Sequence, residues 1–420
     1  MGIIILESDD DLGYIIKKNP SSDMIKRQTR NCEMSGFYKL GSKSSYMVYG
    51  RDFRDCSFKT SSISDNNYLN PNIYSSATFV IAAISDFFDA PLKQIQSTDK
   101  KCVNKLTINA FPFDKNIKML QTFAQYLNVT TDIVKHNGSN KIIIEVNDTI
   151  HYLLNAVIIM MTLLASHNNE DLQIKDSFSE KIISSIVRCD APYFVRYYMS
   201  SRILNRDDFH KFKKVLEKSQ KYHNMILNFG YTAGHRRSFI EKNLSFKNSI
   251  VDIGCGEGFY LIPFSKKIHD KTYIGMDIEL DVLEKLKQKI TDQEIKNVHI
   301  FDDIDNVISQ CNQTNEKYDI IVTEVIEHMD LNLVPTFLQK IIDNINFNKI
   351  IITTPNHDFN QFYKMDTEYR HHDHKWEIGK NEFIELIHKL KLNEQYKTKF
   401  LHIGDVVNDI SCTIGFEIVN

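Results

Sequence analysis

The sequence predicts an α+β domain in the first half of the chain and a doubly wound parallel α/β sheet in the second. From Lys247 onward, short apolar strands alternate with helices, which is typical of a parallel sheet covered on both faces. A glycine-rich turn, Gly254–Gly258, follows the first of these strands and lets the backbone approach a ligand closely. Before that point strands and helices do not alternate. We therefore predict two domains, residues 1–222 and 223–420.

The whole-chain composition bounds the class of protein. A length of 420 residues allows two to three domains. The net charge of −3 gives no overall basic signature, so a nucleic acid would have to be held by a local patch or by its end. Seven scattered cysteines without a CxxC pair indicate reduced thiols, and hence a cytoplasmic protein.

Neither the N-terminus nor the longest apolar run predicts a membrane association. Acidic residues from Glu7 to Asp11 follow a short apolar start, which is unlike a secretory signal. The run Tyr152–Ala165 is shorter than the roughly 20 residues that a membrane span needs. We expect it to form a buried helix.

The first half shows patterns of both strands and helices. Apolar or alternating stretches predict strands at residues 1–6, Tyr46–Tyr49, Leu106–Ala110 and Lys141–Val146. The segment Lys135–Lys141 (KHNGSNK) is typical of a hairpin tip. Helical periodicity covers Tyr74–Phe88, with Asn72 or Ser75 as its cap, then Ile117–Leu127, Thr149–Ser166, Ser177–Arg188, Tyr193–Ser200 and Asp207–Gln220. No cluster of residues in this half demands chemistry, so it is a binding or regulatory domain of unknown partner.

The second half contains five predicted strands, each short and apolar. They are Ser249–Ile253, the TYIGM stretch that ends before Asp277, Val298–Ile300, Tyr318–Thr323 and Asn348–Thr353, with a helix at Asp281–Ile290. Ligands bind parallel sheets at the carboxyl ends of the strands. The residues that follow the strands and share this edge are Gly254, Asp277, Asp302, Glu324 and Asn356.

The glycine turn distinguishes between two kinds of ligand. The stretch DIGCGEG is G-x-G-x-G, and a nicotinamide site expects a later glycine where this chain has Phe259–Leu261. Preceded by Asp252, the turn resembles motif I of class I S-adenosylmethionine-dependent methyltransferases. The resemblance implies that Gly254, Cys255, Gly256 and Gly258 lie against the amino-acid part of the donor and that Asp277 holds the ribose hydroxyls. It places Asp302, Asp303 and Ile304 beside the adenine, although Asp302 or Asp303 could instead be a helix N-cap.

A second group of polar residues follows the fourth strand. Glu324, Glu327 and His328 are spaced so that one helical turn would put them on the same face. Two carboxylates and an imidazole held together are costly unless a group such as a divalent cation neutralises them. His371, His372 and His374 could close such a site from another loop.

The pattern ExxEH, followed by TPNHDFN and RHHDHKWE, resembles the HUA-ENHANCER family of RNA 3′-terminal ribose 2′-O-methyltransferases. The resemblance implies that Glu324, Glu327, His328 and His374 are metal ligands, with Glu327 and His328 essential for catalysis. It favours His374 because the family motif retains the histidine of Asp-His-Lys. Two carboxylates and two imidazoles favour Mn²⁺, with Mg²⁺, Co²⁺ and Zn²⁺ as alternatives. The family usually reads DHKFEW, whereas this chain has Trp376 and Ile378 at two of those positions.

The same resemblance makes an RNA 3′ end the expected partner. The hydroxyls of a terminal ribose could fill the two positions that four protein ligands leave open on an octahedral metal. We expect Asn356, Phe359 and Asn360 to shape the pocket for the RNA end. Arg370 contacts a phosphate or forms a surface salt bridge, and Trp376 stacks on a base or belongs to the core.

The resemblance extends more weakly into the first half. DLGYIIKKNP, GRDFRD and NPNIYSSATFVIAAI are similar to the N-terminal domain of bacterial family members. Those proteins work with a polynucleotide kinase-phosphatase-ligase in RNA repair, so such an enzyme is an expected partner. A second hypothesis is that the chain serves chiefly as a scaffold that activates an RNA ligase. A third, a catechol-type methyltransferase, leaves the TPNHDFN and DHK segments unexplained.

Overall fold

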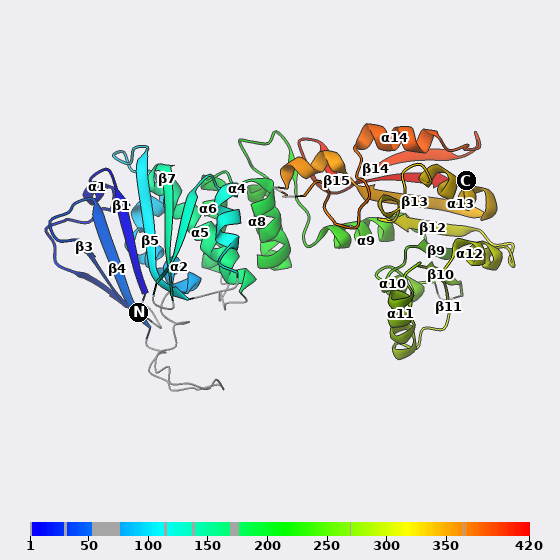
Figure 1. Cartoon of the computed structure of the whole chain (residues 1–420), viewed down its shortest axis with the longest axis horizontal. Coiled ribbons are helices and arrows are strands. Elements are labelled where there is room, and N and C mark those ends of the chain that lie inside the picture. Colours follow the sequence, from blue (N-terminus) through cyan, green and yellow to red (C-terminus); the bar gives the residue numbers. More distant parts are fainter. Residues whose placement is uncertain are drawn as a thin grey trace. The chain divides into compact units, whose positions relative to one another are not determined.

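The computed structural model describes residues 2–28, 32–52, 76–112, 116–136, 139–168, 176–268, 270–363, 365 and 367–420. The chain divides into two compact units, Met1–Lys221 and Tyr222–Asn420 (Figure 1). Each unit has a sheet and helices of its own, and each is described by itself.

The first unit contains a seven-stranded antiparallel sheet with the order β2-β3-β4-β1-β5-β7-β6 (Figure 1). Its strands are β1 (Gly2–Ser8), β2 (Ile25–Gln28), β3 (Cys32–Tyr38), β4 (Ser45–Asp52), β5 (Cys102–Pro112), β6 (Thr130–His136) and β7 (Ser139–Asp148). The four predicted strands are confirmed within β1, β4, β5 and β7. The predicted hairpin tip lies between β6 and β7, where His136 pairs with Ser139.

Helix α5 (Ile150–His167) is the central helix of this unit, and it packs against α2, α3, α4 and α6. It is long and apolar enough to cross a membrane, yet 83% of its residues are buried within the protein. The prediction of a buried helix is therefore confirmed. The other helices are α1 (Leu12–Ile16), α2 (Ala77–Phe87), α3 (Asp89–Lys93), α4 (Met119–Tyr126), α6 (Asp176–Arg188), α7 (Tyr193–Tyr198), the π-helix η3 (Met199–Ile203) and α8 (Arg206–Leu216).

Two helix ends in this unit differ from the prediction. Ser76 caps α2 by accepting a hydrogen bond from the Phe79 N–H group, while the predicted caps Asn72 and Ser75 lie outside the described residues, as does part of GRDFRD. Helix α8 ends at Leu216 rather than Gln220. The buried guanidinium of Arg196 accounts for this end, because it donates to the carbonyl oxygens of Leu216 and Lys218.

The second unit contains an eight-stranded sheet with the order β11-β10-β9-β12-β13-β15-β14-β8. The strands are β8 (Met225–Ile226), β9 (Ser249–Ile253), β10 (Tyr273–Met276), β11 (Val298–Phe301), β12 (Tyr318–Thr323), β13 (Phe347–Pro355), β14 (Lys397–Val407) and β15 (Ile410–Val419). The five predicted strands, β9 to β13, are confirmed as a parallel group.

The predicted doubly wound sheet is confirmed, and three antiparallel strands that the sequence analysis did not predict, β15, β14 and β8, extend it. Strands β14 and β15 form a hairpin whose turn residues, Asn408 and Asp409, have φ angles of 50° and 64°. Two positive φ angles in succession match the right-handed twist of the strands, and Asn and Asp tolerate this conformation well. The hairpin extends the sheet beyond β13 and completes its hydrophobic core.

Helices of this unit alternate with its parallel strands along the chain (Figure 1). They are α9 (Thr232–Asn243), α10 (Leu261–Ser265), α11 (Leu280–Asp292), α12 (Ile304–Cys311), α13 (Val334–Asn344), α14 (Lys380–His388) and the 3₁₀ turns η4 (Ile326–His328) and η5 (His357–Phe362). The predicted helix at Asp281–Ile290 is confirmed within α11. The register of the parallel strands brings the residues after β9, β10, β12 and β13 to one edge.

We predict that Ile158→Ala lowers the free energy of unfolding of the first unit by about 2–5 kcal/mol, because Ile158 is fully buried in α5 and its truncation leaves a cavity. Urea unfolding followed by circular dichroism measures the effect. Val187→Ala, an exposed aliphatic position in α6, is the matched control and should change stability by less than about 0.5 kcal/mol. Equal losses in the two variants would contradict the central role of α5.

Candidate functional site

The glycine turn after β9 is held in a tight conformation that requires glycine. Gly254, Gly256 and Gly258 have φ angles of 75°, 52° and 87°, which favour glycine. A Cβ atom on Gly254 would lie 2.2 Å from Val325 Cγ2, so the packing also requires glycine there. The N–H groups of Gly254 and Cys255 donate to the Met276 carbonyl at 2.7 and 2.9 Å and bind the turn to β10.

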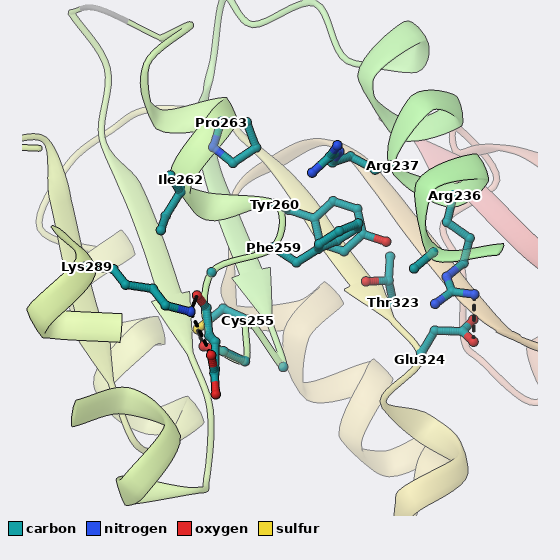
Figure 2. A pocket seen from close by; sticks show the side chains of 15 residues that line it. Arg236, Arg237, Cys255, Phe259, Tyr260, Ile262, Pro263, Lys289, Thr323 and Glu324 are labelled. Atoms are coloured by element: carbon teal, nitrogen blue, oxygen red, sulfur yellow. Dashed lines mark hydrogen bonds and ion pairs between the residues drawn. The ribbon is translucent and has the colours of Figure 1, made fainter. Parts of the chain in front are cut away.

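A cavity of about 610 Å³ opens beside this turn, which is a volume typical of small-molecule sites. Its walls come from the turn, the α9 residues Arg236 and Arg237, and Thr323 and Glu324 after β12 (Figure 2). The Arg237 guanidinium lies 4.6 Å from the centre of the Phe259 ring at the wall of the cavity. The cavity thus joins the glycine turn to the first acidic residue of the ExxEH pattern.

Asp277 has a structural role in the turn. Its Oδ2 atom accepts a hydrogen bond of 2.8 Å from the Gly256 N–H group, and its Oδ1 atom accepts one of 3.1 Å from Glu279 N–H. The carboxylate of Asp277, predicted to bind the ribose hydroxyls, therefore stabilises the conformation of the glycine turn.

Asp252, the acidic residue that precedes the turn, is fully buried. Its Oδ2 atom accepts a 2.9 Å hydrogen bond from the Tyr273 hydroxyl, while Oδ1 has no partner among the residues that the structure describes. Burial raises the pKa of Asp252 to about 7, with a further contribution from Asp277, against the opposing effect of the Tyr273 hydrogen bond. Asp252 therefore has a structural role: it links the end of β9, just before the glycine turn, to Tyr273 of β10.

The three residues predicted beside the adenine have different environments. Asp302 follows β11 and is exposed. Asp303 caps α12 by accepting a 2.9 Å hydrogen bond from the Asn306 N–H group, so the N-cap alternative is confirmed for this residue. Ile304 packs against the hydrophobic core, which leaves only part of its side chain available to a ligand.

The ExxEH segment forms a turn rather than the predicted α-helical face. Glu324 has a φ angle of 54° and ends the strand, and Ile326–His328 form the 3₁₀ turn η4. One ligand atom from each of Glu327, His328 and His374 lies within 4.8 Å of the others. The turn and the distant loop thus assemble a three-residue set that can hold a metal ion.

Glu327 is the buried member of this set. Its Oε2 atom accepts a 3.1 Å hydrogen bond from the Thr354 hydroxyl, but Oε1 has no hydrogen-bond partner within the described chain. Burial, followed by the nearby Glu324 carboxylate, raises the pKa of Glu327 well above its ordinary value. An unpartnered buried carboxylate oxygen beside two imidazoles fits a divalent cation.

Glu324 lies outside the three-residue set. Its carboxylate is 3.3 Å from the Arg236 guanidinium (Figure 2). It also accepts a 3.1 Å hydrogen bond from the Thr353 hydroxyl. The ion pair and the hydrogen bond compensate the charge of the Glu324 carboxylate in this position. To act as a fourth ligand, Glu324 would have to exchange the contact with Arg236 for the metal.

Sequence reasoning missed Glu377, which holds His374. The Glu377 carboxylate accepts hydrogen bonds from His374 Nδ1 at 2.7 Å, Arg370 N–H at 2.8 Å and Asn360 Nδ2 at 2.7 Å. Burial by itself would raise the pKa of Glu377, but these hydrogen bonds together hold the pKa below its ordinary value. Its position three residues after His374, at the end of the RHHDHKWE segment, was the signal that could have identified it.

The five residues predicted near the RNA end make contacts within the protein, and their role toward RNA stays a prediction. Asn356 caps η5, and Asn360 and Arg370 bind each other and the loop around Glu377. Phe359 is fully buried. Trp376 belongs to the core, where its indole N–H donates to the Met329 carbonyl, so the core alternative is correct for this residue.

We predict that Asp252 makes a contribution to the stability of the second unit that falls as the pH rises from about 4 to 7. Because the pKa of Asp252 is raised to about 7 on folding, the folded protein binds more protons than the unfolded chain between the two pKa values. Urea unfolding at a series of pH values, followed by fluorescence of Trp376, measures the slope. Asp252→Asn should flatten it and Asp281→Asn, at an exposed position, should not. Equal slopes in wild type and Asp252→Asn would contradict this assignment.

Comparison with known proteins now gives the family. Residues 3–221 match the family model described as the Hen1 N-terminal domain, and residues 245–400 match a methyltransferase domain. The chain is 26% identical to a small RNA 2′-O-methyltransferase of Arabidopsis thaliana over 38% of this chain and 19% of the relative. It is also 26% identical to one of Xenopus tropicalis, over 40% of this chain and 47% of the relative. The matched regions therefore span less than half of these relatives.

A solved structure of the Pnkp1/Rnl/Hen1 RNA repair complex contains a chain with the same fold. It aligns over the full length of both chains with a TM-score of 0.78 and 22% sequence identity. The family predicted from the ExxEH and DHK motifs is confirmed. The chain belongs to the Hen1 family, and its second unit is an S-adenosylmethionine-dependent methyltransferase domain.

Proposed function

We propose that this protein transfers a methyl group from S-adenosylmethionine to the 2′-hydroxyl of the 3′-terminal ribose of RNA, with a divalent metal in its site. The observation that carries the proposal is the buried Glu327 carboxylate, which has an unpartnered oxygen within the described chain and lies with His328 and His374. Glu324, three residues earlier, lines the cavity beside the glycine turn. The cavity beside the glycine turn, which we call the donor cavity, is thus adjacent to Glu327, His328 and His374, which we call the metal set.

Glu327, His328 and His374 would hold the metal, with Glu324 as the fourth ligand. Their carboxylate and imidazole groups suit Mn²⁺, and Mg²⁺ is an alternative. When bound, the metal supplies Lewis acidity that lowers the pKa of a ribose hydroxyl and makes it a better nucleophile. The hydroxyl oxygen then forms a bond to the methyl carbon as the bond from carbon to the sulfonium sulfur breaks, and the hydroxyl proton leaves to solvent or a nearby histidine.

The restriction to an RNA end follows from the chemistry of the ligand. Only a terminal ribose presents free hydroxyls at both the 2′ and 3′ positions. An internal nucleotide has no free 3′-hydroxyl, and a 3′-phosphate or 2′-deoxy end lacks the vicinal pair. The side chain of His328 is 39% exposed, so an RNA end could reach Glu327, His328 and His374 from solvent.

A role in RNA repair, with a kinase-phosphatase and a ligase as partners, is also part of this proposal. Support comes from the full-length likeness to a chain of the Pnkp1/Rnl/Hen1 RNA repair complex and from the Hen1 N-terminal domain match. The same two observations favour a second candidate function, in which the chain acts chiefly as a scaffold that activates the ligase. The full-length His374→Ala variant would separate the two functions. If the chain is chiefly a scaffold, this variant should still stimulate RNA sealing by the ligase although it no longer methylates RNA.

We expect labelled S-adenosylmethionine and Mn²⁺ to methylate only an RNA that ends in a 2′,3′-diol. The assay compares that RNA with otherwise identical RNAs that end in 2′-deoxy or 3′-phosphate, and it is repeated with EDTA. Label on the diol alone, lost with EDTA, is the expected result. Equal label on all three would mean methylation of a base or an internal position and would contradict the proposal.

We predict that His374→Ala lowers methylation by more than about 100-fold, beyond the roughly 10–100-fold effect typical of outer-shell partners. Binding of S-adenosylmethionine should persist, because the glycine turn is formed by other residues. His371→Ala is the matched control: it removes an imidazole from the same loop whose side chain is 69% exposed, and activity should stay near wild type. Similar losses in both variants would show that His374 has no special role.

A further inference from the structure

We propose that Glu377 is a positioning residue that keeps the proton of His374 on Nδ1 and leaves Nε2 free to ligate the metal; this inference rests on the proposed function. The side chain of Glu377 is fully buried, and its carboxylate lies 2.7 Å from His374 Nδ1. An ionised carboxylate can only accept hydrogen bonds, so the nitrogen facing it must donate. The Glu377 contact therefore selects one tautomer of the imidazole.

The carboxylate is itself held in place by donors from two segments. Oε1 accepts from His374 Nδ1 and from the Arg370 N–H group, and Oε2 accepts from Asn360 Nδ2. Each oxygen thus has a specific donor, and rotation of the carboxyl group would break several hydrogen bonds at once.

Arg370 in turn fixes the orientation of the Asn360 amide. Its Nε–H donates to Asn360 Oδ1 at 2.6 Å, which turns the Asn360 NH₂ group toward Glu377. The two terminal nitrogens of Arg370 donate to the carbonyl oxygens of Cys412 and Asn356 at 2.8 and 2.6 Å. Residues from β15 and from the segment after β13 therefore hold the group that orients His374.

This arrangement makes Glu377→Gln a sharp test. If the NH₂ group of the new carboxamide were directed at Asn360, two donors would face each other where a 2.7 Å hydrogen bond now lies. If it were directed at His374, Nδ1 would have to accept, which moves the imidazole proton to Nε2 and blocks metal ligation. The second orientation reverses the tautomer of His374. The first keeps an acceptor at His374 Nδ1 but loses the Asn360 hydrogen bond that holds the side chain at position 377, so that His374 is less firmly oriented. The size of the side chain is nearly unchanged in either case.

The experiment measures Mn²⁺ binding to the full-length protein by electron paramagnetic resonance, in wild type and Glu377→Gln. Loss of an outer-shell partner typically lowers metal affinity about 10–100-fold, and we expect a loss in that range. Glu382→Gln is the matched control, because Glu382 accepts a hydrogen bond from Gly379 N–H in the same region without touching the metal set. S-adenosylmethionine binding, measured in parallel, should be unchanged in both variants and reports a folded domain.

The tautomer is read directly in wild-type protein by ¹⁵N NMR of the His374 ring, which is independent of how any variant folds. A protonated Nδ1 and an unprotonated Nε2 support the inference, and the reverse overturns it. A wild-type Mn²⁺ site that Glu377→Gln leaves at full affinity, with donor binding intact, overturns the role of Glu377 alone. A wild type without a stoichiometric Mn²⁺ site contradicts the proposed function as well.

Discussion

The Glu327 side chain is a carboxylate that water does not reach, and one of its oxygens has no hydrogen-bond partner in the described chain. A buried charge without compensation costs several kcal/mol, so such a group either keeps a proton or binds a cation. Burial and the Glu324 carboxylate raise the pKa of Glu327, while two imidazoles lie within ligand distance of it. The other polar features of the second unit surround this group: Glu324 and Arg236 on the donor side, and His374 with its supports on the other.

The fold brings these groups together by topology. Strands β9, β10 and β12 are parallel neighbours, so the glycine turn, Asp277 and the ExxEH segment emerge at one edge. The antiparallel hairpin β14–β15 brings Cys412 beside the loop that carries His374, through Arg370. The cavity beside the glycine turn and the set Glu327, His328 and His374 therefore belong to one unit. The first unit has a separate core around α5 and matches the Hen1 N-terminal domain.

Much of this arrangement could be predicted from sequence. Buried parallel strands are continuous apolar runs, and the glycine turn and ExxEH segment carry their chemistry in a few adjacent residues. The β14–β15 hairpin was missed because its Asn-Asp turn is a weaker signal than Asn-Gly. Asn356, Asn360, Arg370 and Trp376 were predicted near the RNA end, but a sequence does not show whether a polar side chain faces a ligand or a neighbouring loop. The Arg236–Glu324 ion pair joins distant segments, which no local pattern reveals. Glu377 lies only three residues after His374, but a sequence does not show that its carboxylate turns back toward that imidazole.

The most direct test of the metal set is anomalous diffraction at the manganese absorption edge, from crystals of the full-length protein grown with Mn²⁺. Our account predicts one strong anomalous peak in contact with Glu327, His328 and His374, and Glu324 turned from Arg236 toward it. A peak at the exposed cluster His371, His372 and Asp373 instead, or no peak near Glu327, would contradict the account.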